Sequence, residues 1–461
     1  MPSYSSEQFR KDWVYSCDQD FQSTDGRPAT WAPGQPTYWG NEDAKIPLPT
    51  TPADSSLNAD GSLIAVALEH DIQVYTTSDL KLLQVLKGHV SRVDAVRFHP
   101  KIPFALVTCA MNYHARSVKA EPVIIFWDLD EQRLRKPDPK VLVQNLARRA
   151  VQGLVSGLQD SQSVWIPDKT EQTDLARDLE RSIGTMSTKA LVRDNRRIFG
   201  RLATSFGGHV FNRDGTSIVY LPGERPSSKG VNKWDIYVWD TAKAENRLTL
   251  EGHTDAITWI GFSPDDKLIG SVCWDQTFRI WIHETGTLLH TFRSNQQNWT
   301  GGFSPDSRYF AGTSGEGRFW IWDMLDGSDV ATHDFGPSGR WCRTLDWSPD
   351  GRQLVLGGRG LGRLIVFDIE DKRIVQERSL STKNCPENLP RFTRDFLEVS
   401  SVRYLPGGRK IAFQTSGDNG LEVYDRVDNS KWRFAPRAGI DSISRRRGDT
   451  TLGITPREGD Q

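Results

Sequence analysis

The sequence predicts an all-β fold, a seven-bladed propeller with a helical insertion between the second and third blades. Two recurring phrases support this prediction. The first is a turn phrase that follows an aromatic residue, Phe-Ser-Pro-Asp at 262–265 and 303–306 and Trp-Ser-Pro-Asp at 347–350. The second is an apolar residue, an aromatic residue and often Asp, as at 321–323. The paired phrases fall in units of about 40–45 residues, the length of one propeller blade.

Weaker copies complete the set of seven units. Turn phrases also follow Leu57, Phe98, Phe211 and Tyr404. Alternating stretches such as 257–262, and short apolar runs bounded by Gly-rich turns, are typical of buried strands. Four short strands per unit favour radial closure, because a ring protects the edges of its sheets.

The phrases resemble those of WD40 repeats over about residues 52–435, and the fourth unit is the best copy. The resemblance implies that His253, Ser271, Asp275 and Trp281 form a buried hydrogen-bonded tetrad within one blade. A buried imidazole and a buried carboxylate each need partners, which these residues would supply to one another. His89 also follows a Gly, but no Asp matches Asp275 in its unit, so we expect one complete tetrad.

We expect four parts along the chain: an N-terminal arm at 1–50, the propeller at 51–435, the helical insertion at 131–204 within it, and a mobile basic tail at 436–461. The arm is rich in aromatic residues, which disordered segments usually lack. Part of it should therefore pack on the propeller, where it could add an outer strand to the seventh blade. Alternatively, residues 431–434 supply that strand.

The insertion shows the pattern of two amphipathic helices. One begins at Asp138, whose side chain can cap the helix before Pro139, and the other runs from near Thr173 to Gly184. Arg148 and Arg149 lie off the apolar stripe of the first helix. The helices either cover an edge of the propeller or recruit a partner, and an excess of Lys and Arg suits an acidic one.

Composition narrows the class of protein. The formal net charge is -1, which gives no general attraction to nucleic acid or to anionic membranes. No apolar run approaches the ~20 residues of a membrane span. The N-terminus lacks the pattern of a signal peptide, and the 5 Cys show neither a metal pattern nor a disulfide framework. We therefore expect an intracellular protein, cytoplasmic or nuclear, without nucleic acid as a direct ligand.

Catalytic signatures are weak. The Gly-rich segment 357–362 lacks the Lys and Ser/Thr of a phosphate loop and precedes a strand, so it is interpreted as a hairpin. We expect no enzyme activity, cofactor or metal, and predict a scaffold or adaptor that binds one or more proteins or peptides. The alternatives are a reader of peptides, histone tails or nucleic-acid assemblies, and an enzyme with a site in the central channel.

Family topology also suggests a binding surface. Turns that lead into the innermost strands share one rim with the hairpins between second and third strands. The predicted partner-binding residues on this rim are Trp299, Arg318, Arg340, Trp341, Arg343 and Arg359. Trp and Arg are enriched at binding hot spots. The alternative is that these Trp residues pack between blades and the Arg residues are solvated.

Overall fold

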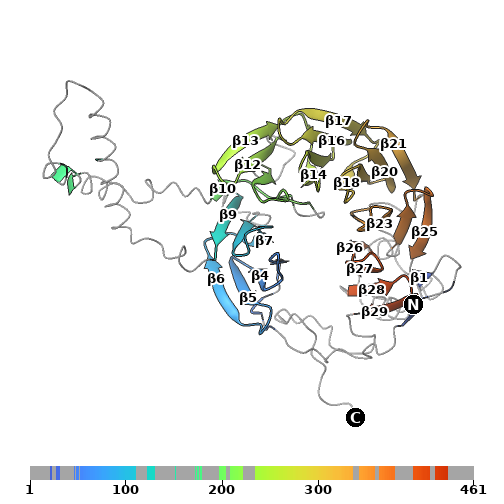
Figure 1. Cartoon of the computed structure of the whole chain (residues 1–461), viewed down its shortest axis with the longest axis horizontal. Coiled ribbons are helices and arrows are strands. Elements are labelled where there is room, and N and C mark those ends of the chain that lie inside the picture. Colours follow the sequence, from blue (N-terminus) through green and yellow to red (C-terminus); the bar gives the residue numbers. More distant parts are fainter. Residues whose placement is uncertain are drawn as a thin grey trace, which may run out of the picture.

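The computed structural model describes most of the propeller. The described residues are 52–110, 122–129, 197–203, 208–221, 234–335, 342–358, 363–378, 398–415 and 421–433, with short pieces at 21–22, 27, 29–31, 46, 48–50, 151, 172, 174–175 and 177–178. They form seven sheets placed radially around a central axis, antiparallel except for one short parallel pair in the last sheet (Figure 1). The predicted fold class, a seven-bladed all-β propeller, is thus confirmed.

Each blade is built from consecutive strands, numbered from the channel outward. Blade 1 contains β3 (Asp54–Leu57), β4 (Leu63–Leu68), β5 (Asp71–Thr76) and β6 (Leu82–Lys87). Blade 2 contains β7 (Val93–Phe98), β8 (Ala105–Ala110), β9 (Val123–Asp128) and β10 (Arg197–Phe199). Blade 3 contains β11 (Ser217–Tyr220), β12 (Ile236–Asp240) and β13 (Glu245–Leu250). In blade 3 the innermost position is held by an isolated bridge between Phe211 and Ile218.

The remaining blades follow the same order. Blades 4 and 5 contain β14 (Ile257–Phe262), β15 (Leu268–Cys273), β16 (Thr277–Ile282) and β17 (Leu288–Arg293), and β18 (Asn298–Phe303), β19 (Tyr309–Ser314), β20 (Arg318–Asp323) and β21 (Asp329–Asp334). Blades 6 and 7 contain β22 (Thr344–Trp347), β23 (Gln353–Gly357), β24 (Leu364–Asp368) and β25 (Arg373–Arg378), and β26 (Val399–Tyr404), β27 (Lys410–Thr415), β28 (Leu421–Asp425) and β29 (Ser430–Arg433).

The Ser-Pro-Asp phrase closes the hairpin between the first and second strands of a blade. In blade 4, the Ser263 hydroxyl donates to Asp265 over 2.7 Å and accepts from the Leu268 amide over 2.9 Å. Blades 5 and 6 repeat both bonds. In the weaker copies, the Asn58 and Asn212 side chains accept the same amide bond. A short polar side chain that holds the turn therefore defines the repeat, and Asn can replace Ser there.

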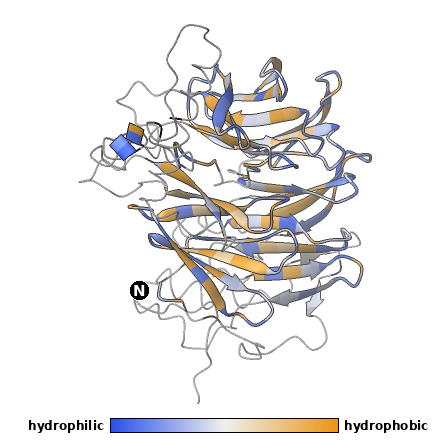
Figure 2. Cartoon of the chain, turned by 60° about the vertical axis from the view of Figure 1, so that its left-hand side comes forward, coloured by the Kyte–Doolittle hydropathy of each residue, from blue (hydrophilic) through white to orange (hydrophobic). Residues whose placement is uncertain are grey.

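Apolar side chains fill the seams between blades. Six clusters of described residues each join two successive blades, from blades 1 and 2 to blades 6 and 7. In Figure 2 the hydrophobic residues are concentrated in the strands, interrupted by hydrophilic ones, and the turns are more hydrophilic. Because these six seams bury apolar surface between neighbouring sheets, the blades stabilise one another.

The insertion begins and ends within the second blade. Arg197–Phe199 pairs antiparallel with β9, register Arg197 to Ile125, and so forms the outer strand of that blade. The insertion therefore joins the third and outer strands of blade 2 and does not lie between blades 2 and 3 as predicted. A three-residue strand gave too short a pattern to be recognised beside the predicted helices.

Few residues of the predicted helices lie in the described part of the chain. Val151, Gln172, Asp174, Leu175, Arg177 and Asp178 are helical. Val151 is buried, whereas Leu175 is 41% exposed. No described helix is long and apolar enough to cross a membrane. Arg148, Arg149 and the tail at 436–461 lie outside the described residues.

Two pieces of the N-terminal arm pair with the last blades. β1 (Phe21–Gln22) lies antiparallel to β25 and extends blade 6. β2 (Thr30–Trp31) lies parallel to β29 and extends blade 7. The seventh blade thus takes its outer strand from its own unit, and the arm adds a strand beyond it.

Candidate functional site

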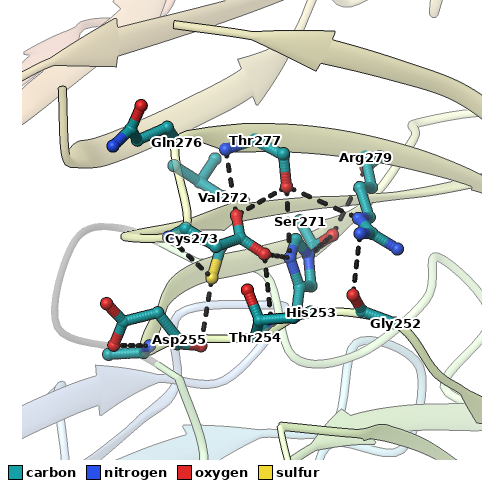
Figure 3. Close-up of polar contacts among 12 residues, drawn as sticks. Gly252, His253, Thr254, Asp255, Ser271, Val272, Cys273, Gln276, Thr277 and Arg279 are labelled. Atoms are coloured by element: carbon teal, nitrogen blue, oxygen red, sulfur yellow. Dashed lines mark hydrogen bonds and ion pairs between the residues drawn. The ribbon is translucent and has the colours of Figure 1, made fainter. Parts of the chain in front are cut away.

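The structure brings the four residues of the expected tetrad into one network in blade 4. Figure 3 shows the polar contacts around His253, Ser271 and Thr277 of this network. His253 Nε2 lies 2.8 Å from Ser271 Oγ, and His253 Nδ1 lies 2.8 Å from Asp275 Oδ2. The Trp281 indole N–H donates to Ser271 Oγ over 3.1 Å. A carboxylate only accepts, so the network assigns the imidazole proton to Nδ1, and the Ser271 hydroxyl donates to Nε2.

Asp275 is the most connected member of the tetrad. Besides His253, it accepts bonds from the Thr254 amide over 3.1 Å and from the Thr277 amide and hydroxyl over 2.9 and 2.6 Å. Burial acts to raise the pKa of Asp275, but the bonds from His253, Thr277 and Thr254 outweigh it and hold the pKa below its ordinary value. Burial also lowers the pKa of His253, so a neutral imidazole faces an ionised carboxylate.

A thiol adjoins this network. The ligand atoms of His253, Cys273 and Asp275 lie within 4.8 Å of one another. Each is already engaged in the blade, since the Cys273 thiol donates to the Asp255 carbonyl over 3.0 Å and burial raises its pKa. The hydrogen bonds of this cluster connect the turn before β14 to the β15–β16 hairpin, so its role in the blade is structural.

Blade 2 contains a partial copy that sequence reasoning missed. His89 Nε2 lies 2.6 Å from Thr108 Oγ1, which accepts the Trp127 indole N–H over 2.7 Å. Thr108 takes the place of Ser271, and the longer turn after Phe98 shifts its spacing. Within the described ranges, the buried His89 Nδ1 has no hydrogen-bond partner. Burial, aided by the charges of Arg197 and His70, lowers the pKa of His89 to about 4.

This histidine makes stability depend on pH. An unfolded His takes up a proton near pH 6.5, whereas the folded His89 resists protonation down to about 4. Stability should therefore fall as pH falls from 6.5 towards 4, by about 1.4 kcal/mol per unit. We expect His89→Gln to reduce this slope in urea melts at pH 7, 6 and 5. An exposed Lys101→Gln variant should keep it, and equal slopes for wild type and His89→Gln would contradict the assignment.

The rim that carries Asp275 also carries a line of aromatic and charged side chains across four blades. Trp274 and Trp299 meet edge to face with centroids 5.5 Å apart. The Arg343 guanidinium carbon lies 4.3 Å from the Trp299 ring centroid, and Arg343 Nη1 lies 3.5 Å from Glu398 Oε2. We call these four residues the rim cluster. Trp299 is buried, while the Arg343 side chain is 26% exposed.

Among the other predicted rim residues, the structure describes only Arg318, which does not join this cluster. Arg318 pairs with Asp334 of the outer strand over 3.0 Å, which directs it away from the channel. Arg340, Trp341 and Arg359 lie outside the described residues. Trp274 and Glu398 belong to the cluster but were not predicted as partner-binding residues. The Trp-Asp dipeptide at 274–275 is common at this site of the repeat and so favours a structural role for Trp274, and Glu398 follows a long segment without a repeat phrase.

The seven radial sheets and the hydrogen-bonded tetrad of blade 4 define a seven-bladed β-propeller built from sequence repeats. The family model for the WD domain, G-beta repeat, matches residues 244–281, which contain the whole tetrad. Residues 244–281 are thus similar to one WD40 repeat.

Several curated proteins are similar to parts of the chain. Periodic tryptophan protein 2 of Arabidopsis thaliana is 25% identical over 170 residues, 33% of this chain and 19% of that protein. Meiotic recombination protein rec14 of Schizosaccharomyces pombe is 26% identical over 216 residues, 45% of this chain and 65% of that protein. Eukaryotic translation initiation factor 3 subunit I of Pyricularia oryzae is 30% identical over 130 residues, which are 27% of this chain and 37% of that protein. The chain thus spans less than two thirds of each.

Proposed function

We propose that this propeller is a non-enzymatic scaffold or adaptor that holds a protein or peptide partner at the rim cluster, inside the cell. The observation that carries the proposal is the line from Trp274 to Glu398, which crosses blades 4 to 7 at one rim. Buried aromatic residues that orient an Arg are typical of binding hot spots. One relative is named as a subunit of a translation initiation factor, which describes it as part of a larger assembly and supports a scaffold role here.

The rim cluster suits recognition more than catalysis. The guanidinium of Arg343 lies over the ring of Trp299 and forms an ion pair with Glu398, and these two contacts fix its position. An Arg fixed in this way loses little conformational freedom when it binds a carboxylate or a peptide carbonyl. We therefore propose that the partner offers an acidic or carbonyl-rich segment to this rim.

The test is a charge reversal with a matched control. Arg343→Glu should reduce the recovery of at least one specific partner roughly tenfold or more in quantitative affinity purification. Arg373→Glu is the control, because Arg373 also pairs with a carboxylate, Asp371 at 3.0 Å, but lies on the outer strand of blade 6. Retention of every partner by a folded Arg343→Glu protein would contradict the proposal. If that variant is misfolded, Arg343→Met serves instead.

A further inference from the structure

Blades 2 and 4 hold their buried histidines in the same way. His89 Nε2 lies 2.6 Å from Thr108 Oγ1 in blade 2. His253 Nε2 lies 2.8 Å from Ser271 Oγ in blade 4. In both blades this hydroxyl also accepts the indole N–H of a Trp, and the centroids of the His and Trp rings are 6.4 Å apart. The two imidazoles therefore have the same position relative to their sheets.

The glycine before each histidine also contacts an arginine. Arg279 Nη2 donates to the Gly252 carbonyl over 2.7 Å. A Cβ atom on Gly88 would meet the side chains of Arg197 and Trp127. Arg279 belongs to the third strand β16, whereas Arg197 belongs to the outer strand β10. Each histidine thus has a guanidinium beside the residue that precedes it.

The two blades differ at the acceptor for the second imidazole nitrogen. In blade 4, the Asp275 carboxylate lies 2.8 Å from His253 Nδ1. In blade 2, His89 is 6% exposed, and its buried Nδ1 has no hydrogen-bond partner in the described part of the chain. No described Asp or Glu is among the groups that shift the pKa of His89. Because the imidazoles are placed alike, His89 Nδ1 faces the place that Asp275 occupies in blade 4.

The sequence accounts for this difference. Ala110 and Cys273 each pair with the first residue of an innermost strand, so they hold equivalent positions. Asp275 lies two residues after Cys273, and Asn112 lies two residues after Ala110. Asn112 is outside the described residues. At this position the sequence thus supplies a neutral amide in blade 2 and a carboxylate in blade 4.

Two observations favour a carboxylate as the acceptor for His89 Nδ1. First, Thr108 accepts from Trp127, and His89 Nε2 is the acceptor that the described residues give to its hydroxyl. The imidazole proton therefore lies on Nδ1, where a charged acceptor forms a stronger hydrogen bond than a neutral one. Second, the positive charge of Arg197 acts at this place, since it contributes to the lowered pKa of His89.

We propose that blade 2 contains a carboxylate-binding site, in which the carboxylate of a ligand accepts from His89 Nδ1 and is attracted by Arg197. The carboxylate belongs to an Asp or Glu side chain of a bound protein or to a small organic acid, since both offer the same group. It completes in blade 2 the network that Asp275 completes in blade 4. This inference does not rest on the partner proposed for the rim cluster, which lies in blades 4 to 7.

NMR spectroscopy of the full chain, isotope-labelled at histidine Cε1, tests the site without weakening the fold. Sodium acetate, compared with sodium chloride at equal ionic strength, should shift the His89 resonance. It should also raise the pKa of His89 from about 4 by about one unit or more, a tenfold gain in proton affinity, because a nearby anion favours the charged imidazole. The spectrum of His89→Gln assigns the resonance.

His253 is the internal control, because Asp275 already accepts from its Nδ1. The His253 resonance should not respond to acetate. Absence of an acetate effect at His89, or equal effects at the two histidines, would overturn the proposal.

Two blocked tripeptides distinguish the sources of the carboxylate. Acetyl-Gly-Glu-Gly-amide should shift the His89 resonance as acetate does if the ligand is a protein side chain, and acetyl-Gly-Gln-Gly-amide should not. A response to acetate alone identifies a small organic acid. Equal responses to the two peptides would show that no carboxylate is recognised, which also overturns the proposal.

The variant Asn112→Asp supplies the carboxylate from the chain itself. It should raise the pKa of His89 without ligand and remove the response to acetate. An acetate response as large as that of the wild type would place the acetate elsewhere and so refute the site.

Discussion

Asp275→Ala is expected to lower the free energy of unfolding by about 3 kcal/mol or more. The variant removes the acceptor for His253 Nδ1, the Thr254 amide, and both the amide and the hydroxyl of Thr277. Buried donors left without partners account for most of the loss, since each keeps its desolvation cost. Chemical denaturation monitored by tryptophan fluorescence measures it.

The control for this variant needs a carboxylate outside any network. Asp266 is unsuitable, because it accepts bonds from the Arg213 amide over 2.8 Å and from Asn212 over 3.2 Å, and so connects blades 3 and 4. Asp214 is exposed in the turn of blade 3, and Asp214→Ala should change stability by under about 0.5 kcal/mol. Equal denaturation midpoints for the Asp275 and Asp214 variants would show that the tetrad carries no stability.

The buried ion pair between blades 6 and 7 should give an effect of similar size. Arg378 Nη2 lies 3.6 Å from Glu422 Oε1, and the two side chains are 1% and 2% exposed. The Arg378 guanidinium also lies 4.7 Å from the Phe413 ring centroid. Glu422→Gln leaves a buried cation beside a neutral amide, and Arg378→Met leaves a buried carboxylate. Each single variant should cost about 3–5 kcal/mol in thermal or urea melts.

The double variant separates the pair from its surroundings. Because Arg378→Met with Glu422→Gln removes both charges at once, it should lose clearly less stability than the sum of the single variants. The coupling in this double-mutant cycle should exceed about 1 kcal/mol. Additive losses would mean that each charge is held by other groups and that the pair does not connect the two blades.

The repeat phrases predict the blades because they encode local chemistry. Ser263, Ser304 and Ser348 each close a hairpin through hydrogen bonds to residues two and five positions later in the chain. The turn can therefore be predicted from a short stretch of sequence. The fourth blade is predicted to the level of single residues for the same reason. His253, Ser271, Asp275 and Trp281 all occupy fixed positions within one unit.

Features that depend on distant segments could not be predicted in this way. No sequence motif marks the pairing of Phe21 with Arg378, because a strand of two residues is too short to show a periodic pattern. Arg343 was predicted as a partner-binding residue of the rim, but its contacts, Trp299 in blade 5 and Glu398 in blade 7, come from two other blades. Thr108 was missed because an altered turn length moved it out of register with Ser271.

The pairing of β1 with β25 also sets an order of events during synthesis. β25 follows β1 by roughly 350 residues, and ribosomes add about 5–20 residues per second. The arm therefore leaves the ribosome roughly 20–70 s before its partner strand exists. During that interval the sheets of blades 1 to 5 can form while β1 still lacks its partner strand, so the arm can extend blade 6 only after most of the ring has been synthesised.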